Sequence, residues 1–195
     1  MRGDRRHIQD ADVQLLCRRS PLPINLEMAA TDEMLKMALL NKPSWVCFVP
    51  EKREELTTEG GLNVLTLSKP LQQMTAVLQS KKIKVSYFID PDLKQVRAAA
   101  EANADAVEFH TGQWVLSQGA RKKQDWKDLQ QAAVLADQLG LRVHAGHGLD
   151  FEHTNKIKQL SHLVEVNIGH SLICYSLEMG LKKAVQQMKK QLVQN

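Results

Sequence analysis

Six short apolar runs recur along the chain, and each is followed by a longer stretch in which apolar residues have helical spacing. This alternation predicts parallel strands that are joined by right-handed helical crossovers. Thr31 or Asp32 can cap one such helix, and the stretch PDLKQVRAAAEAN has the spacing of another. The pattern fits an α/β barrel or a doubly wound sheet. The predicted strands cover residues 24–29, 45–50, 84–90, 106–112, 142–148 and 164–170.

Polar side chains occupy every second position in several of these runs. Alternate strand residues point to opposite faces, so one face of the sheet carries carboxylates and amides. Helices on both faces of an open sheet would bury those groups without partners, whereas a barrel collects them in its lumen. We therefore favour the barrel. The polar positions are Asn25, Glu27, Glu108, His110, Glu165 and Asn167, and the apolar ones include Ile24, Leu26, Met28, Val107, Phe109, Val164, Val166 and Ile168.

One segment, PEKREELTTEGGLNV at residues 50–64, interrupts the pattern with a polar, glycine-containing stretch. In a barrel the loops that follow the strands build the active site. A long charged loop at this place is a candidate lid.

The chain has 195 residues, of which 43% are hydrophobic, enough for one sizeable core. Residues 1–195 are therefore expected to form a single domain. The sequence has neither a run of about 18 apolar residues nor an apolar signal-peptide core, so we expect a cytoplasmic protein without a membrane partner.

The formal net charge is +4, which raises the question of an anionic partner. Paired lysines such as Lys81 and Lys82 lie mostly in helix-like segments that also carry acidic or amide residues, as solvated helix faces do. No common nucleic-acid motif occurs, so nucleic acid is not expected as a partner. The cluster of Arg2, Arg5, Arg6 and His7 is a better candidate for binding phosphate.

The three cysteines, Cys17, Cys47 and Cys174, are widely spaced and form no CxxC motif. This spacing indicates neither a disulfide framework nor a zinc knuckle. Each cysteine is expected to be small buried filler.

Titratable residues gather where the predicted strands end, namely Glu27, Glu51, Glu108, His110, His147 and His170. A barrel brings all its strand ends to one rim, so these side chains become neighbours. Acid–base chemistry suits them, because histidine titrates near neutrality and burial raises the pKa of a carboxyl group.

A metal site is the less favoured interpretation of the same residues. His144 and His147 are three positions apart, so on a strand they face opposite sides, and neither HExxH nor His-x-His occurs. We expect no metal.

Small residues follow three of the strands, in HTG, AGHG and IGHS. Backbone N–H groups can approach an anion closely at glycine, and the last two loops of a barrel often hold phosphate. AGHG and IGHS follow the last two predicted strands, which indicates phosphorylated small-molecule substrates.

Several motifs together resemble the pyridoxine 5′-phosphate synthase family, in the family's order and across the whole chain. PEKREELTTEGG is highly specific among them. The motifs are DRRHIQDADV (4–13), NLEMA (25–29), VPEKREELTTEGGLNV (49–64), SYFIDPD (86–92), VEFHTG (107–112), AGHGL (145–149) and NIGHSLI (167–173).

The resemblance implies an α/β barrel that condenses 3-amino-2-oxopropyl phosphate with 1-deoxy-D-xylulose 5-phosphate, without a cofactor. The products are pyridoxine 5′-phosphate, phosphate and water. By motif, Glu27 resembles a general base, His147 a proton donor and Glu108 the residue that stabilises the transition state. Arg2, His7 and Thr57 match contacts of the deoxyxylulose phosphate, and Gly148, Gly169 and His170 match contacts of the aminooxopropyl phosphate. His144 stands where the family usually has Asn. Members assemble as oligomers, so a homo-oligomer is expected.

The chain departs from the family at its beginning. Met1 corresponds to the exit of the family's second strand, so the expected fold is a TIM-type (β/α)8 barrel that lacks its first strand and helix, most of its second strand and one catalytic histidine. Tyr175 stands near a position where the family commonly has Arg, and Gln113-Trp114 is an unusual continuation of HTG.

Three explanations of the short beginning stay open, and we favour the first. The sequence is a fragment or has a misplaced start; it is a real, inactive or weakly active chain that keeps phosphate binding; or it needs a partner chain to supply the missing strands.

Overall fold

The computed structural model describes residues 5, 7–50 and 60–193. The predicted alternation of strands and helices is confirmed. The strands are β1 (Asn25–Ala29), β2 (Trp45–Val49), β3 (Lys84–Ile89), β4 (Ala106–His110), β5 (Arg142–Gly146) and β6 (Leu163–Asn167). The helices are α1 (Asp10–Arg19), α2 (Asp32–Asn41), α3 (Val64–Ser80), α4 (Leu93–Glu101), α5 (Gly112–Leu116), α6 (Gly119–Gln138), α7 (Phe151–Ile157), α8 (His170–Met179) and α9 (Leu181–Val193).

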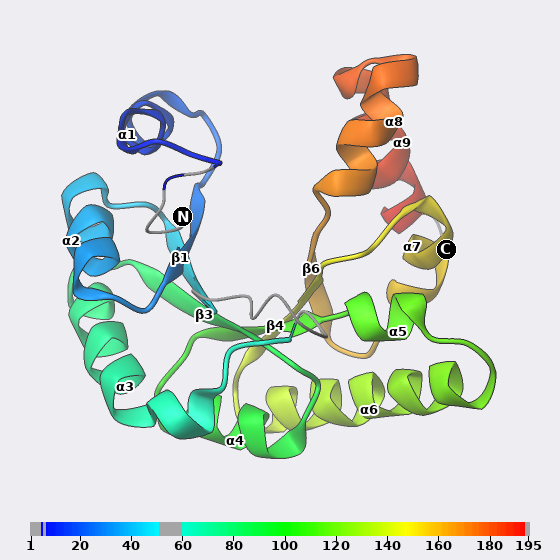
Figure 1. Cartoon of the computed structure of the whole chain (residues 1–195), viewed down its shortest axis with the longest axis horizontal. Helices are drawn as coiled ribbons and strands as arrows, with labels where there is room; N and C mark the ends of the chain where they lie inside the picture. Colours follow the sequence, from blue (N-terminus) through cyan, green and yellow to red (C-terminus); the bar gives the residue numbers. More distant parts are fainter. Residues whose placement is uncertain (1–4, 6, 51–59, 194–195) are drawn as a thin grey trace.

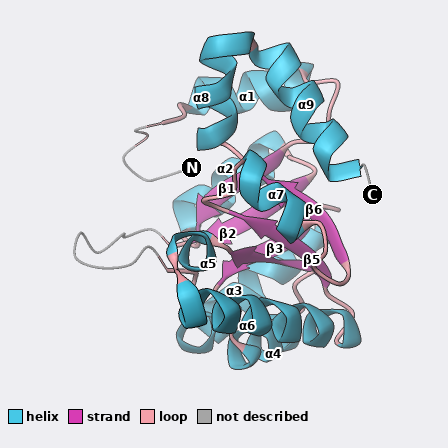
Figure 2. Ribbon diagram, turned by 90° about the vertical axis from the view of Figure 1, so that its right-hand side faces the viewer, coloured by secondary structure: helices cyan, strands magenta, loops and turns pink. Residues whose placement is uncertain are grey.

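All the described strands form one parallel sheet in the order β1-β2-β3-β4-β5-β6, so neighbours in the chain are neighbours in space. The sheet curves strongly, and helices α2, α3, α4 and α6 cover its convex face (Figure 1). Helix α1 lies near β1 and helices α8 and α9 follow β6, so they stand apart at the two edges of the sheet (Figure 1), and all three are at the top of the side view (Figure 2). This sequential parallel order is the arrangement expected for part of a barrel wall.

The convex face carries the core, as the strand alternation predicted. Met28, Phe48, Tyr87 and Phe109 are fully buried beneath the covering helices. Each large apolar side chain removed from water contributes about 1.5–3 kcal/mol to stability. The apolar strand residues therefore pack against the helices and stabilise the sheet, and the alternate, polar residues face the lumen.

The helices begin where short polar side chains can accept from the backbone. The hydroxyl of Thr31 accepts from the N–H of Met34, so Thr31, and not Asp32, caps α2. Asp92 caps α4 by accepting from Lys94 and Gln95. Among the described helices, none combines the length and apolar character that a membrane span requires.

Strand β6 departs from the predicted alternation at Val164. A bulge shifts the register, so that Val143 pairs with Leu163 while His144 pairs with Glu165. Leu163 packs against the core and Val164 is 56% exposed. The prediction that Val164 lies on the core face was therefore wrong, because a bulge inserts one extra residue and reverses the parity before it.

Candidate active site

Polar side chains from β1, β2 and β6 gather in the lumen around Glu108 on β4. Cys47 lies beside Glu27 in the β1–β2 register, and its Sγ is 3.8 Å from Oε2 of Glu108. Asn167, at the end of β6, donates from Nδ2 to the same oxygen at 2.8 Å. Glu108 is 3% exposed, whereas Glu27 is exposed. The polar parity of β1, β2, β4 and β6 therefore forms one cluster.

Glu108 is held in its neutral form by these surroundings. Burial, together with the negative charges of Glu27 and Glu165, raises its pKa from 4.5 to about 8, although the hydrogen bond from Asn167 works in the opposite direction. A carboxyl group with this pKa is mostly protonated at pH 7, and it can donate a hydrogen bond or a proton.

Glycine at position 146 makes room for Glu108. A Cβ at this position would lie 2.1 Å from Oε1 of Glu108 and 3.1 Å from Cβ of Asn167. Any larger residue would displace the carboxyl group, so the first glycine of AGHG shapes the lumen.

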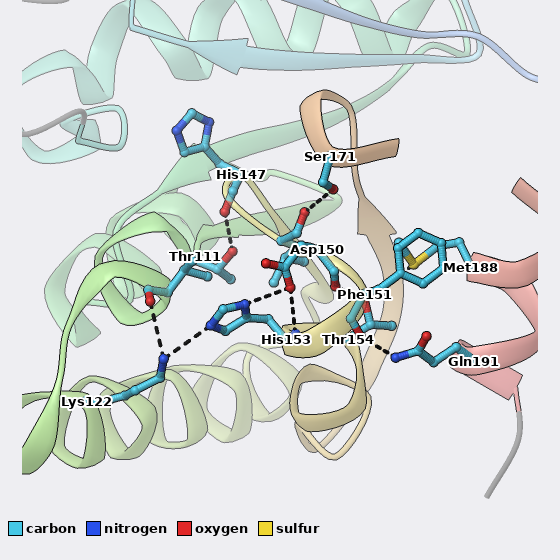
Figure 3. A network of polar contacts seen from close by, with 12 residues as sticks. Thr111, Lys122, His147, Asp150, Phe151, His153, Thr154, Ser171, Met188 and Gln191 are labelled. Carbon is cyan, nitrogen blue, oxygen red and sulfur yellow. Dashed lines mark hydrogen bonds and ion pairs between the residues drawn. The ribbon is translucent and has the colours of Figure 1, made fainter. Parts of the chain in front are cut away.

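His147 follows β5 in a left-handed backbone conformation, with φ of +72°. A non-glycine residue adopts this conformation only when its surroundings impose it. The buried hydroxyl of Thr111 supplies such a restraint, because it lies 2.5 Å from the carbonyl of His147 and 2.9 Å from that of Gly146. Figure 3 shows the His147 imidazole directed away from the polar network that fixes its backbone.

That network also secures the residues after His147. Oδ1 of Asp150 accepts from both the backbone N–H and Nδ1 of His153, each at 2.8 Å, and Nε2 of His153 lies 3.2 Å from Nζ of Lys122 (Figure 3). From α8, Ser171 donates to the carbonyl of Leu149 at 2.6 Å. The loops after β5 and β6 are thereby joined.

The two glycine loops expected to hold phosphate lie at this junction. Gly148 is exposed with φ of +80°, and Gly169 is exposed and has open space where a Cβ would stand. His170, also exposed, is the first residue of α8. The N-terminus of a ten-residue helix favours an anion, so this geometry can hold a phosphate group.

His110, one of the titratable residues expected at the strand ends, pairs with Asp90, which the sequence analysis did not assign to the site. Nδ1 of His110 lies 3.2 Å from Oδ1 of Asp90, and the rings of His110 and His147 are 4.9 Å apart. The sequence contained a clue to this pair, because His110 lies on the polar face of β4 and Asp90 directly follows β3, the neighbouring strand.

The remaining predicted residues are placed less centrally. His7 is exposed just before α1, while Arg2, Thr57, Glu51 and most of the candidate lid lie outside the described residues. The last residues of the lid segment attach to β3, where the N–H of Leu62 donates to the carbonyl of Phe88 at 2.7 Å.

His144 is a buried lumen residue, 1% exposed, beneath Trp45 and 3.7 Å from a carboxylate oxygen of Glu165. Burial lowers its pKa, and the nearby Arg142 acts in the same direction, while Glu165 opposes them. His144 therefore stays neutral at pH 7 and supports the lumen.

The description of the cysteines as buried filler needs correction. Cys174 is exposed, and Cys17 is only partly buried. Cys47 is buried, but it contacts Glu108, and its burial and that carboxyl group raise the pKa of its thiol well above 9.0. Across the described ranges, no three His, Cys, Asp or Glu side chains are placed to hold a metal ion.

The chain is similar to known proteins in sequence and in fold. Residues 1–194 match the family model described as pyridoxal phosphate biosynthesis protein PdxJ. The chain is 56% identical over 190 residues to pyridoxine 5′-phosphate synthase of Bdellovibrio bacteriovorus, covering 97% of this chain and 79% of the relative. It is 45% identical over 195 residues to the same enzyme of a Synechococcus species, covering 100% and 78%.

A solved 3-keto-L-gulonate-6-phosphate decarboxylase from Vibrio cholerae has the same fold, with a TM-score of 0.64 at 12% identity over 94% of this chain and 78% of its own. The structural neighbours are TIM-barrel enzymes, so the predicted fold class is confirmed. The described part of the chain supplies six parallel strands of such a barrel. The family model matches residues 1–194, and the chain is 56% and 45% identical to the two synthases from Bdellovibrio bacteriovorus and Synechococcus. The chain therefore belongs to the pyridoxine 5′-phosphate synthase family.

Proposed function

We propose that this chain condenses 3-amino-2-oxopropyl phosphate with 1-deoxy-D-xylulose 5-phosphate, closing the pyridine ring of pyridoxine 5′-phosphate and releasing phosphate and water. The observation that carries the proposal is that one parallel sheet has an exposed carboxylate on β1 and a neutral carboxylic acid on β4, with a histidine in the loop after β5. Amine addition to a carbonyl, dehydration and ring closure are successive proton transfers, and they need such a set of acids and bases.

Each of these three side chains has a distinct role. Glu27, exposed at the lumen, is the general base that removes protons from the substrates. His147 is the proton donor to the departing hydroxyl group. Glu108, neutral at pH 7 and fixed by Asn167, donates a hydrogen bond to the oxygen that gains negative charge in the transition state.

The phosphate groups anchor the two substrates. Gly148, Gly169 and His170 hold the aminooxopropyl phosphate, and the open space at Gly169 supports this assignment. Arg2, His7 and Thr57 hold the deoxyxylulose phosphate; the first and last lie outside the described residues. Two fixed phosphates hold the reacting carbons close together, so the bimolecular step becomes effectively intramolecular.

The test is pyridoxine 5′-phosphate formation by the purified chain when both substrates are supplied. We expect product from the parent chain and a rate at least about a hundredfold lower in Glu27→Gln and in His147→Asn, because each loses a proton-transfer group. The matched controls are Glu101→Gln, at the end of α4, and His162→Asn, before β6; both residues are exposed. A parent that forms no product, or site variants as active as the controls, would contradict the proposal.

Self-association accompanies this function. Leu177 on α8 is 84% exposed, and Ile173 and Leu181 beside it are each 55% exposed, which supports a homo-oligomer that covers them. Sedimentation equilibrium is expected to give a mass above one chain for the parent and a lower mass for Leu177→Asp. Leu40→Asp on α2, at a side chain 71% exposed, is the control that keeps the parent's mass. A parent that stays monomeric at every concentration would contradict the assembly.

A further inference from the structure

The buried imidazole of His110 has a defined partner on one side. Its Nδ1 lies 3.2 Å from Oδ1 of Asp90, and the residue is 5% exposed. Burial tends to raise the pKa of Asp90, but hydrogen bonds from His110 and from the N–H of Gly61 lower it overall. A carboxylate only accepts hydrogen bonds, so Nδ1 carries the ring proton and Nε2 has a lone pair.

The other nitrogen of this ring has no hydrogen-bond partner among the described residues, although it is fully buried. A Cβ added to Gly112 would lie 2.7 Å from Nε2 of His110 and 3.0 Å from Cδ2 of His147, so both rings border the same point. Leaving a buried acceptor unpaired costs about 1–3 kcal/mol, and in native structures such an exception needs an explanation.

Titratable groups of three neighbouring segments face this ring. They are Asp90 after β3, Glu108 two residues earlier on the polar face of β4, and His147 after β5, whose ring centroid is 4.9 Å away. Phe88 packs edge-on against both imidazoles, at 5.3 Å from His110 and 6.2 Å from His147. The apolar ring limits the directions from which water can reach the pair.

We propose that His110, held by Asp90, is a positioning residue that stores and returns a proton for His147 during ring closure. The inference rests on the proposed function, because His147 must give up a proton to a departing hydroxyl and be ready for further transfers. It concerns two residues, His110 and Asp90, that the family motif did not assign to catalysis.

The proton count balances within the pair. When His147 holds a proton that the substrates have released, that proton moves to the lone pair on Nε2 of His110, directly or through one water. His110 is then an imidazolium beside the Asp90 carboxylate, and His147 is neutral. The proton returns to His147 before the hydroxyl group departs, and it leaves with that group as water. No oxidant or other reactant is needed.

A structural role alone would make a different prediction. If His110 only fills space between Phe88 and Gly112, a side chain of similar size should preserve both rate and pH profile. If it stores a proton, the negative charge of Asp90 matters as well, because that charge stabilises the imidazolium.

Two variants separate these roles. His110→Gln keeps a polar side chain without a titrating ring, and Asp90→Asn keeps an acceptor for Nδ1 but removes the charge. We expect kcat to fall by at least about tenfold in His110→Gln, and in the same direction in Asp90→Asn, with KM little changed and the pH profile of kcat altered in both. Asp90 is 51% exposed, so its substitution leaves the fold intact.

The matched control is His162→Gln. His162 is also paired with an aspartate through Nδ1, to Asp137 at 3.2 Å, but it precedes β6 at the other end of the strands and is exposed. This variant is expected to keep the parent's kcat and pH profile. His110→Gln and Asp90→Asn profiles that coincide with this control would overturn the proposal.

A second readout does not depend on turnover. The ring nitrogens of His147 are observed by nitrogen-15 NMR at a single pH, because their chemical shifts report which of them carries a proton. These shifts are expected to change in His110→Gln and to stay the same in His162→Gln. Identical His147 shifts in the parent and in His110→Gln would overturn the proton exchange even if the chain makes product. If the parent makes no product, the proposed function fails and the NMR comparison still decides whether the two histidines share a proton.

Discussion

The Glu108→Gln protein is expected to form pyridoxine 5′-phosphate at no more than about one-tenth of the parent's rate, because an amide N–H is a weaker hydrogen-bond donor than a carboxylic acid to the oxygen that gains negative charge. It should fold normally, since glutamine has nearly the same shape and its amide oxygen can still accept from Nδ2 of Asn167. Initial rates at saturating substrates are the measurement. A rate within a few-fold of the parent would remove Glu108 from the chemistry.

The same substitution has a pH signature in stability. Glu108 binds its proton in the folded state up to about pH 8 but loses it near pH 4.5 when unfolded, so the parent's free energy of unfolding falls as pH rises between these values. The effect is on the order of a few kcal/mol. Glu108→Gln lacks this loss of stability. Its free energy of unfolding should therefore match that of the parent near pH 4.5 and exceed it above about pH 8.

Urea unfolding of both proteins across this pH range measures that difference. Other titrating groups are common to both chains, so subtracting one stability curve from the other isolates Glu108. A difference that stays constant with pH would contradict the burial argument, whatever happens to the rate.

Gly146→Ala is expected to have the second large effect. The added methyl would lie 2.1 Å from Oε1 of Glu108, so the carboxyl group must move, which disturbs the hydrogen bond that its other oxygen accepts from Asn167. Overpacking of this kind costs about 1–3 kcal/mol of folding free energy. The expected rate loss approaches that of Glu108→Gln, because the same group is displaced.

A double-mutant comparison tests this cause. In a Glu108→Ala background the main clash is gone, so the stability cost of Gly146→Ala should fall sharply. An equal cost in both backgrounds would show that the methyl conflicts with some other part of β5.

The sequence predicted the parallel sheet because the alternation of apolar and polar residues within each strand is a local pattern. Every predicted run overlaps a strand, although β6 begins one residue before its run, at Leu163. The residues left over at several run ends, such as His147 and Gly148, lie in the loops of the site. The exposure of Val164 could not be predicted in this way, because the bulge that exposes it depends on how β6 pairs with β5.

Individual site residues were harder to predict than the wall. Glu108 stood out as a carboxylate in an apolar run, but its pKa depends on Glu27, Glu165 and Asn167, which come from two other strands. Cys47 looked like filler because its contact with Glu108 spans 61 positions of sequence. Asp90 was hidden for a related reason, since nothing near it in the sequence identifies His110 as its partner.

The most direct test of the central claim, that the lumen keeps a neutral carboxylic acid at the middle of the site, is a carbon-13 NMR titration of the Glu108 carboxyl group in the parent chain. The expected result is a side chain that is mostly protonated at neutral pH, with a midpoint at about pH 8. A midpoint near 4.5, the ordinary value, would show an ionised Glu108 and contradict the claim.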